Sequence, residues 1–166
     1  MTDQRLFGEL YAAPYGVLEP EHAIVVDDGA GTAIGYAVGA LDTRAFEARC
    51  AAEWWPSLRE RYLVGSGGSN LDQLLIAMLH HPHLADEDVV ARHPSHLHID
   101  LLPECQGAGW GRRLMDHLQE LLRADGSPGV HLGVNTRNQG ALAFYIHLGY
   151  EELSRNQMSH TLGLRL

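Results

Sequence analysis

The chain has 166 residues, of which 45% are hydrophobic, and its 12 basic against 21 acidic residues give a net charge of −9. This length suits one domain, over residues 1–166, with one hydrophobic core. The acidic balance argues against nucleic acid or an anionic membrane as a partner and suits a cationic amine. No apolar run could span a bilayer and no targeting signal opens the chain, so we expect a cytoplasmic monomer or homodimer.

The first forty residues predict a packed N-terminal segment followed by a β-hairpin. Residues 2–20 are apolar in places but show no sustained periodicity. Residues 22–27 and 33–41 read as two strands, and the turn-rich residues 28–32 connect them. Gly35 and Gly39 leave the second strand without side chains at two positions, which indicates either close approach of a ligand or space for packing.

The next segment predicts two helical stretches. Thr43 is the expected N-cap of a helix with Phe46 and Cys50 on one face, and Pro56 is expected to bend or break it. The glycine- and serine-rich residues 63–70 predict a loop, and residues 71–79 predict a second, short helix. Cys50 and Cys105 have neither metal-binding nor redox spacing.

Residues 95–123 predict a strand, a glycine turn and a helix. Leu97, Ile99 and Leu101 alternate with polar residues, which is the pattern of a strand with one buried face, and Pro103 ends it. The turn 106–111 has almost no side chains and leads into helical apolar spacing. Backbone N–H groups at such a helix start can bind a phosphate. The turn lacks the ending of a nucleotide P-loop and the third glycine of a dinucleotide fingerprint, because Arg112 and Arg113 follow it.

Two motifs resemble those of the GNAT superfamily of N-acyltransferases. The turn Gln-x-x-Gly-x-Gly at 106–111 resembles the acyl-CoA pyrophosphate loop of that superfamily. Downstream of a predicted strand at 130–134, residues 138–150 read N-x-x-A-x-x-F-Y-x-x-x-G-Y and resemble its second motif. The resemblance implies that Asn138 contacts the cofactor and that Tyr145 protonates the departing CoA thiolate. Seven residues are nearly two helical turns, so both side chains are expected on one helix face.

A narrower resemblance covers most of the chain. Residues 35–62 and 96–104 resemble bacterial acetyltransferases similar to the C-terminal acetyltransferase-like domain of O-GlcNAc hydrolase. The implied fold is α/β (α+β), a GNAT-like mixed, mostly antiparallel central sheet flanked by helices. Two closing strands, at 151–153 and 158–164, and a two-helix insertion before the cofactor-loop strand complete it. That domain of the animal enzyme is thought to have lost its cofactor loop, whereas the loop is intact here.

The implied activity is transfer of an acetyl group from acetyl-CoA to a primary amine, such as a protein lysine or a small amine. The alternative is a module that binds acetyl-CoA, or a partner protein, without turnover. By resemblance, the sheet is splayed near residues 100–102, the pantetheine pairs with the strand backbone there, and the pyrophosphate meets the glycine turn. The implied cofactor-binding residues are Ile99, Asp100, Leu101, Gln106, Gly107, Ala108, Gly109, Trp110, Gly111, Arg112, Asn138 and Tyr145.

The resemblance names no general base, so local chemistry supplies the candidates. Asp100 is the first choice because its side chain lies opposite the buried leucines, beside the expected cofactor. His98 is second because imidazole titrates near neutrality, and Asp42 is third. Asp42, Trp54 and Trp55 are the expected substrate-binding residues.

No metal is expected, although the chain has eleven histidines. The histidines show no H-x-x-x-H pair on a helix and no cysteine partner at ligand spacing, and most are expected to be exposed or hydrogen-bonded. The histidines that come closest to a metal-binding cluster in the sequence are His80, His81, His83, His93, His96 and His98.

Overall fold

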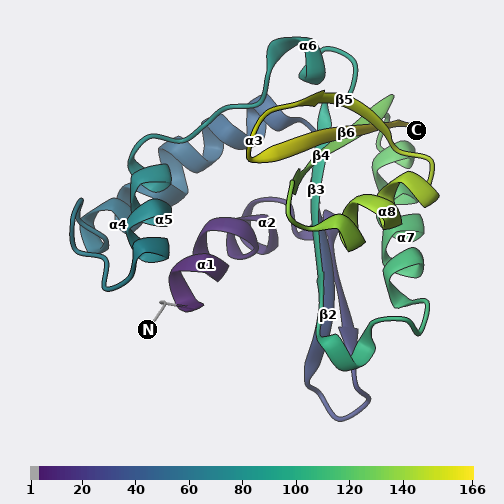
Figure 1. Ribbon diagram of the computed structural model, residues 1–166, viewed down its shortest axis with the longest axis horizontal. Helices are drawn as coiled ribbons and strands as arrows, with labels where there is room; N and C mark the ends of the chain where they lie inside the picture. Colours follow the sequence, from purple (N-terminus) through teal and green to yellow (C-terminus); the bar gives the residue numbers. More distant parts are fainter. Residues whose placement is uncertain (1–3) are drawn as a thin grey trace.

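A computed structural model describes residues 4–166 and shows a six-stranded sheet with helices on both sides (Figure 1). The strand order is β1-β2-β3-β4-β6-β5, and every neighbouring pair is antiparallel except β3 and β4. The predicted mixed, mostly antiparallel sheet is therefore confirmed. The strands are β1 (Ala23–Asp27), β2 (Ala33–Ala40), β3 (Ser95–Leu101), β4 (Gly129–Asn135), β5 (Glu151–Arg155) and β6 (Ser159–Arg165).

The N-terminal segment is helical, which the sequence did not predict. It forms α1 (Gln4–Tyr11), α2 (Ala13–Leu18) and a 3₁₀ turn at Pro20–His22, while residues 2 and 3 lie outside the described part. Leu6 is fully buried and clusters with Leu75 and Ile76 of α5 (Asn70–His80). Glycine and proline inside these short helices hide the helical period, so contacts with α5 and β2 stabilise them rather than local propensity.

A distorted helix follows β2 on the same side of the sheet. It comprises α3 (Thr43–Arg49), a π-helical stretch (Cys50–Trp54) and α4 (Trp55–Arg61). The predicted bend is present, and it precedes Pro56: the Trp55 N–H bonds to the Cys50 carbonyl, five residues back. Proline has no N–H for the carbonyl four residues earlier, so the helix widens there. The N-cap is Asp42 rather than Thr43, because the Asp42 carboxylate accepts the Ala45 N–H.

The insertion before β3 is confirmed and contains one more helical turn than predicted. Helix α5 begins with a capping box in which Ser69 and Asp72 bond each other's backbone N–H groups. The additional turn is α6 (Glu87–Val90). Helices α1 to α5 lie on one side of the sheet, and α7 and α8 lie on the other (Figure 1).

The main core lies between the sheet and α7 (Trp110–Ala124). Leu114, Met115, Leu118 and Leu122 of α7 are almost completely buried in one cluster with Leu97 of β3. Each such side chain stabilises the fold by about 1.5–3 kcal/mol.

The two glycines of β2 make room for this packing. A Cβ at Gly35 would lie 2.3 Å from Cδ2 of Leu101, and a Cβ at Gly39 would lie 3.3 Å from Cδ1 of Leu118. These glycines therefore serve packing rather than ligand approach. Among residues 4–166, none of the helices is both long and apolar enough to cross a membrane.

Candidate functional site

The sheet opens between β3 and β4, the one parallel pair. Only two residue pairs join these strands, Ser95 with Val130 and His96 with His131. Beyond His96, no strand among residues 4–166 pairs with the edge of β3 that faces β4. The splay that the sequence placed near residues 100–102 therefore begins several residues earlier.

Alternate residues of β3 direct their backbone groups into this opening. The Leu102 N–H bonds to the Ile34 carbonyl at 3.0 Å, and Leu102 would be the next residue in register with Ile34. Because the hydrogen-bonded residues of an antiparallel ladder alternate, Asp100 also faces β2, whereas Ile99 and Leu101 face the opening. The predicted backbone contact at Asp100 is corrected on this ground, and those at Ile99 and Leu101 remain.

Two side chains hold the exposed backbone groups of Leu101. The Asp100 carboxylate accepts its N–H at 2.9 Å, and the Gln106 amide donates to its carbonyl at 3.1 Å. A ligand amide that pairs with Leu101 must displace these two side chains. Gln106 and Asp100 thus lie at the opening in contact with the strand, and their roles in binding a cofactor stay predictions.

The glycine turn provides space and N–H groups suited to a pyrophosphate. Gly107 and Gly109 have φ angles of 78° and 84°, and a Cβ at either would meet nothing within 4 Å. Gly109 is the N-cap of α7, where no side chain caps the first turn. Gly111 differs, because its Cβ would lie 3.1 Å from the Phe144 ring. It allows α7 to approach α8 (Gln139–His147) closely.

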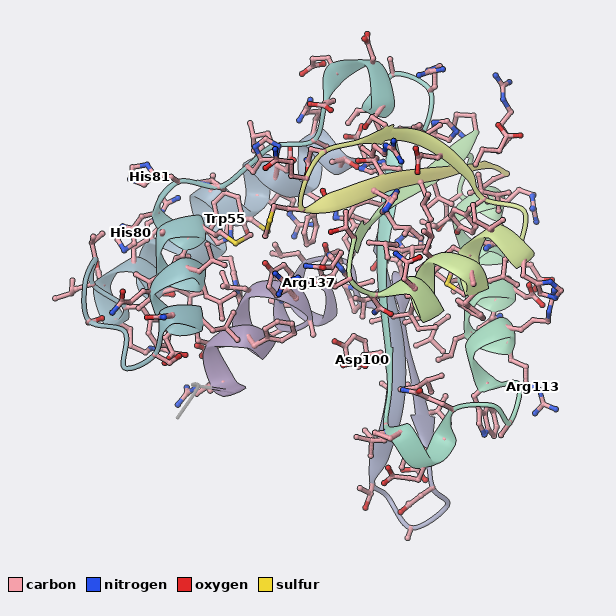
Figure 2. All side chains as sticks on the ribbon, in the orientation of Figure 1. Trp55, His80, His81, Asp100, Arg113 and Arg137 are labelled. Carbon is pink, nitrogen blue, oxygen red and sulfur yellow. The ribbon has the colours of Figure 1, made fainter. Side chains whose placement is uncertain are left out.

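Trp110 and the two arginines follow at the start of α7. The Arg113 guanidinium stacks over the Trp110 ring, 5.0 Å from its centroid, and extends away from the opening (Figure 2). Arg112 is half exposed and lies 4.0 Å from Asp116, at the limit of an ion pair. Arg112 is therefore the arginine available for a phosphate.

Tyr145 lies on α8 with its ring buried in the main core. Burial, and next the negative charge of Asp100, raise the pKa of Tyr145 to about 12. The hydroxyl has no hydrogen-bond partner among residues 4–166. It is a protonated donor at neutral pH, as a general acid must be.

Asn138 precedes α8, which corrects the prediction that it shares a helix face with Tyr145. Its side-chain oxygen accepts the Ala141 N–H at 3.0 Å, so it is the N-cap of α8. A cofactor contact through that oxygen would compete with the cap.

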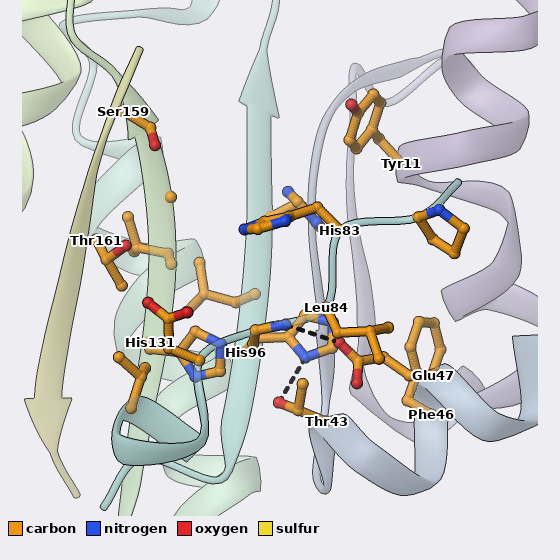
Figure 3. A pocket seen from close by; sticks show the side chains of 18 of the residues that line it. Tyr11, Thr43, Phe46, Glu47, His83, Leu84, His96, His131, Ser159 and Thr161 are labelled. Carbon is orange, nitrogen blue, oxygen red and sulfur yellow. Dashed lines mark hydrogen bonds between the residues drawn. The ribbon is translucent and has the colours of Figure 1, made fainter. Parts of the chain in front are cut away.

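A cavity of about 520 Å³ lies where the ladder between β3 and β4 ends (Figure 3). His96 and His98 of β3, His131 of β4, and side chains of α1, α2, α3 and the loop before α6 line it. Its volume is typical of sites for small molecules. The residues that form its inner wall are Tyr11, Tyr15, Thr43, Phe46, His96, His98 and His131.

His96 is held by a chain of hydrogen bonds across the cavity wall. The Thr43 hydroxyl donates to the Pro94 carbonyl at 2.6 Å, so it must accept from Nδ1 of His96 at 2.8 Å. Nε2 then accepts the Tyr15 hydroxyl at 2.7 Å. Burial lowers the pKa of His96 well below its usual value, which agrees with this neutral tautomer. Both ring nitrogens are occupied.

His98 projects from the same face of β3 as His96. Its ring makes edge contacts with the rings of Tyr11 and Tyr15. Burial, and next the charge of His131, lower the pKa of His98 to about 4. The near-neutral titration expected from the sequence is therefore wrong, and His98 is a weak base.

The predicted base and substrate residues are separated by the fold. Trp55 lines the cavity, whereas Asp100, Asp42 and Trp54 are absent from its wall. Asp100 is exposed on the cavity side of the sheet (Figure 2). Asp42 caps α3, and the indole N–H of Trp54 bonds to the Glu9 carbonyl at 2.8 Å. The roles of Asp100, Trp55 and Asp42 stay predictions.

Tyr15, Thr43 and His131 are among the cavity residues that the sequence did not predict. Tyr15 lies in a segment without visible helical periodicity, and the position of Thr43 at a helix start suggests only a cap. His131 is one polar residue inside an apolar strand, so only the pairing of β4 with β3 places it at the opening.

The histidines considered as metal ligands are spread over the fold. His80 bonds to the Tyr62 carbonyl, and His93 packs under Gly129 and Gly163. Within residues 4–166, one group has ligand atoms close enough for a metal, formed by Glu19, Glu21 and His22. Both His22 nitrogens already bond carboxylates, those of Glu19 and Asp125.

Comparison with known proteins bears on the family of this chain. A family model described as "Acetyltransferase (GNAT) family" matches residues 3–150. Protein O-GlcNAcase of Rattus norvegicus is 26% identical over 141 residues, which cover 83% of this chain and 15% of that protein. The chain thus spans a small part of the curated relatives that it matches.

Solved structures share the architecture. The crystal structure of SsHAT is 40% identical, covers 99% of this chain and 82% of that one, and superposes with a TM-score of 0.88. The structure of yncA from Salmonella typhimurium with its cofactor acetyl-CoA is 14% identical, with a TM-score of 0.50 over 87% of this chain and 64% of that one. This likeness shows a shared fold alone. The family model covers nearly the whole chain, and on that ground the chain belongs to the acetyltransferase (GNAT) family.

Proposed function

We propose that the chain transfers the acetyl group of acetyl-CoA to a primary amine bound in the cavity. The observation that carries this proposal is the shared position of the sheet opening and the cavity. The pair His96 and His131 is the last rung of the ladder and also part of the cavity wall. A thioester aligned along β3 from the glycine turn would therefore present its carbonyl to the cavity.

The chain's own groups suit each part of such a donor. The N–H groups of residues 107–112 bind the pyrophosphate, with Arg112 beside them, and Ile99 and Leu101 pair with the pantetheine amides as an added strand would. A neutral amine attacks the carbonyl, and Tyr145 gives its proton to the departing sulfur. The net charge of −9 favours the approach of cationic amines.

Two measurements test the proposal. Acetyl-CoA should bind and raise the stability of the fold by about 2.7 kcal/mol at a hundredfold excess over its dissociation constant. CoA release should then depend on an amine from a panel of lysine peptides, polyamines, amino sugars and aminoglycosides. Absence of binding would overturn the proposal, and binding without amine-dependent release would favour the module that binds without turnover.

A further inference from the structure

His131 has a fixed orientation at the last rung of the β3–β4 ladder. Its Nδ1 lies 2.7 Å from the His93 carbonyl, which can only accept a hydrogen bond. Nδ1 therefore carries the proton, and Nε2 of the neutral ring has a lone pair. The backbone of β4 and the bond to His93 thus present one acceptor atom in a defined direction.

The ring that carries this acceptor atom lines the cavity. His131 belongs to the cavity wall beside His96 (Figure 3). Nε2 makes none of the side-chain hydrogen bonds found within residues 4–166, and His93 Nδ1 is the single fully enclosed side-chain nitrogen or oxygen there that lacks a partner. Nε2 is therefore not fully enclosed, and we take the cavity to be the side from which a ligand reaches it.

Several other polar groups that line the cavity near His131 are occupied or less well oriented. His96, Thr43 and Tyr15 use their polar atoms in the chain that ends at Pro94. The Glu47 carboxylate bonds to Arg44 and to the Ala85 N–H. His98 has no fixed partner for either nitrogen among the described residues, so nothing orients its lone pair.

The position of the glycine turn also indicates that the acyl end of the donor lies near His131. The turn follows the C-terminal end of β3, and the cavity lies at the N-terminal half of that strand, at residues 96–98. A donor whose pyrophosphate lies at the turn therefore extends its acyl end toward the rung that His131 forms.

We propose that His131 is a catalytic residue of this acetyl transfer: its Nε2 accepts a hydrogen bond from the acceptor nitrogen and takes the proton as the new C–N bond forms. The inference rests on the proposed function. The nitrogen lone pair forms the C–N bond, and the C–S bond breaks with its electron pair on sulfur. Sulfur receives the Tyr145 proton and Nε2 receives the amine proton. Tyr145 then regains a proton from solvent as His131 releases one, so the products are an amide and a thiol.

The surroundings keep the ring neutral and ready to accept a proton. Burial lowers the pKa of His131, and the backbone groups of His93 and Ser95 beside the ring, together with the charge of Glu47, act against this lowering, while Arg44 adds to it. His96 and His98 also face it, and both have pKa values lowered mainly by burial. A weak base suffices, because the proton on nitrogen becomes far more acidic once the nitrogen has bonded to the carbonyl carbon.

The test replaces His131 by residues that keep or remove its volume. His131→Gln keeps hydrogen-bonding capacity but cannot take a proton, and should lower kcat about 10²–10⁴-fold with acetyl-CoA affinity unchanged. It should also remove the acid-side inflection from the pH profile of kcat/KM. His131→Ala should regain activity when imidazole is added. The control His81→Gln, on an exposed residue outside the cavity wall, should behave as the wild type.

The possible failures are distinguishable. Wild-type protein without amine-dependent CoA release overturns the proposed function and this role together. A His131→Gln variant with the wild-type kcat and pH profile overturns the role of His131 alone. Should neither variant fold, nitrogen NMR of the wild-type ring decides: the acceptor amine should shift the Nε2 resonance, and an unchanged resonance would overturn the inference.

Discussion

The cofactor side and the acceptor side of the opening are built in different ways. On the proposed cofactor side, residues 99–112 form one continuous stretch and would act mainly through backbone N–H and carbonyl groups. On the acceptor side, Tyr15, Thr43, His96 and His131 come from four separate elements and act through side chains. The difference has a consequence for prediction. A site that binds its ligand through the backbone of one stretch can be found from a local sequence motif, whereas a cavity lined by side chains from several elements can be found only from the packed fold.

The largest effect should come from a charge on the cofactor side. Gly109→Asp places a carboxylate at the proposed pyrophosphate site and forces a side chain to a φ of 84°, so acetyl-CoA binding should be abolished. The ligand-induced shift in melting temperature measures this. Gly126→Asp is the matched control, because Gly126 has a φ of 93° and open space just beyond the other end of α7. If both variants respond alike to acetyl-CoA, the turn is not the phosphate site.

A smaller effect is expected where the two sides meet, at Tyr145. Tyr145→Phe should lower kcat about 10²–10⁴-fold, because the hydroxyl acts only as the thiolate departs, while the dissociation constant of acetyl-CoA stays the same. Steady-state kinetics under chemistry-limited conditions and calorimetry measure the two quantities. Tyr150→Phe removes a neighbouring buried hydroxyl that accepts a hydrogen bond from Gln119, and should affect stability rather than kcat. Equal kcat values for Tyr145→Phe and wild type would make Tyr145 a core residue only.

The smallest effect should be a loss of folding stability at acid pH, which we expect to come from the histidines of the acceptor side. The folded pKa of His98, about 4, lies below its ordinary 6.5, so the unfolded chain takes up the proton first as the pH falls. His98 therefore supports the fold above pH 6.5, and that support is lost as the pH falls from 6.5 toward 4. His96 and His131 act in the same direction. Each such histidine can change the free energy of unfolding by at most about 1.4 kcal/mol per pH unit.

Urea unfolding at pH 7.5 and pH 5 measures this loss. His98→Gln should lose less stability in acid than the wild type, whereas His147→Gln, on exposed α8 surface, should lose as much as the wild type. An acid loss that is the same in all three proteins would contradict the assignment of acid sensitivity to the cavity.

Much of the fold was predictable, because the strands and α7 carry strong local periodicity. The helices α1 and α2 were not, since Gly8, Pro14 and Gly16 conceal their pattern and their stability comes from α5 and β2. On the cofactor side the motif identified the turn, but ladder alternation was needed to separate Asp100 from Ile99 and Leu101.

On the acceptor side, few of the expected residues reach the cavity. Trp54 and Trp55 are adjacent in the sequence, yet the π-helical stretch sends one to Glu9 and the other to the cavity. The sequence did not indicate a role for His131, because the position of a polar residue in a short strand cannot be interpreted until the neighbouring strand is known.

Because only two residue pairs join β3 to β4, the sheet consists of two half-sheets, β1-β2-β3 and β4-β6-β5, that are held together by few backbone contacts. A pantetheine bonded along the free edge of β3 would act as the missing rungs and fasten one half to the other. We therefore expect amide exchange and protease cleavage to slow when acetyl-CoA is bound, because fewer partial openings remain. In a cell, the abundance of this protein would then follow the supply of its acetyl donor.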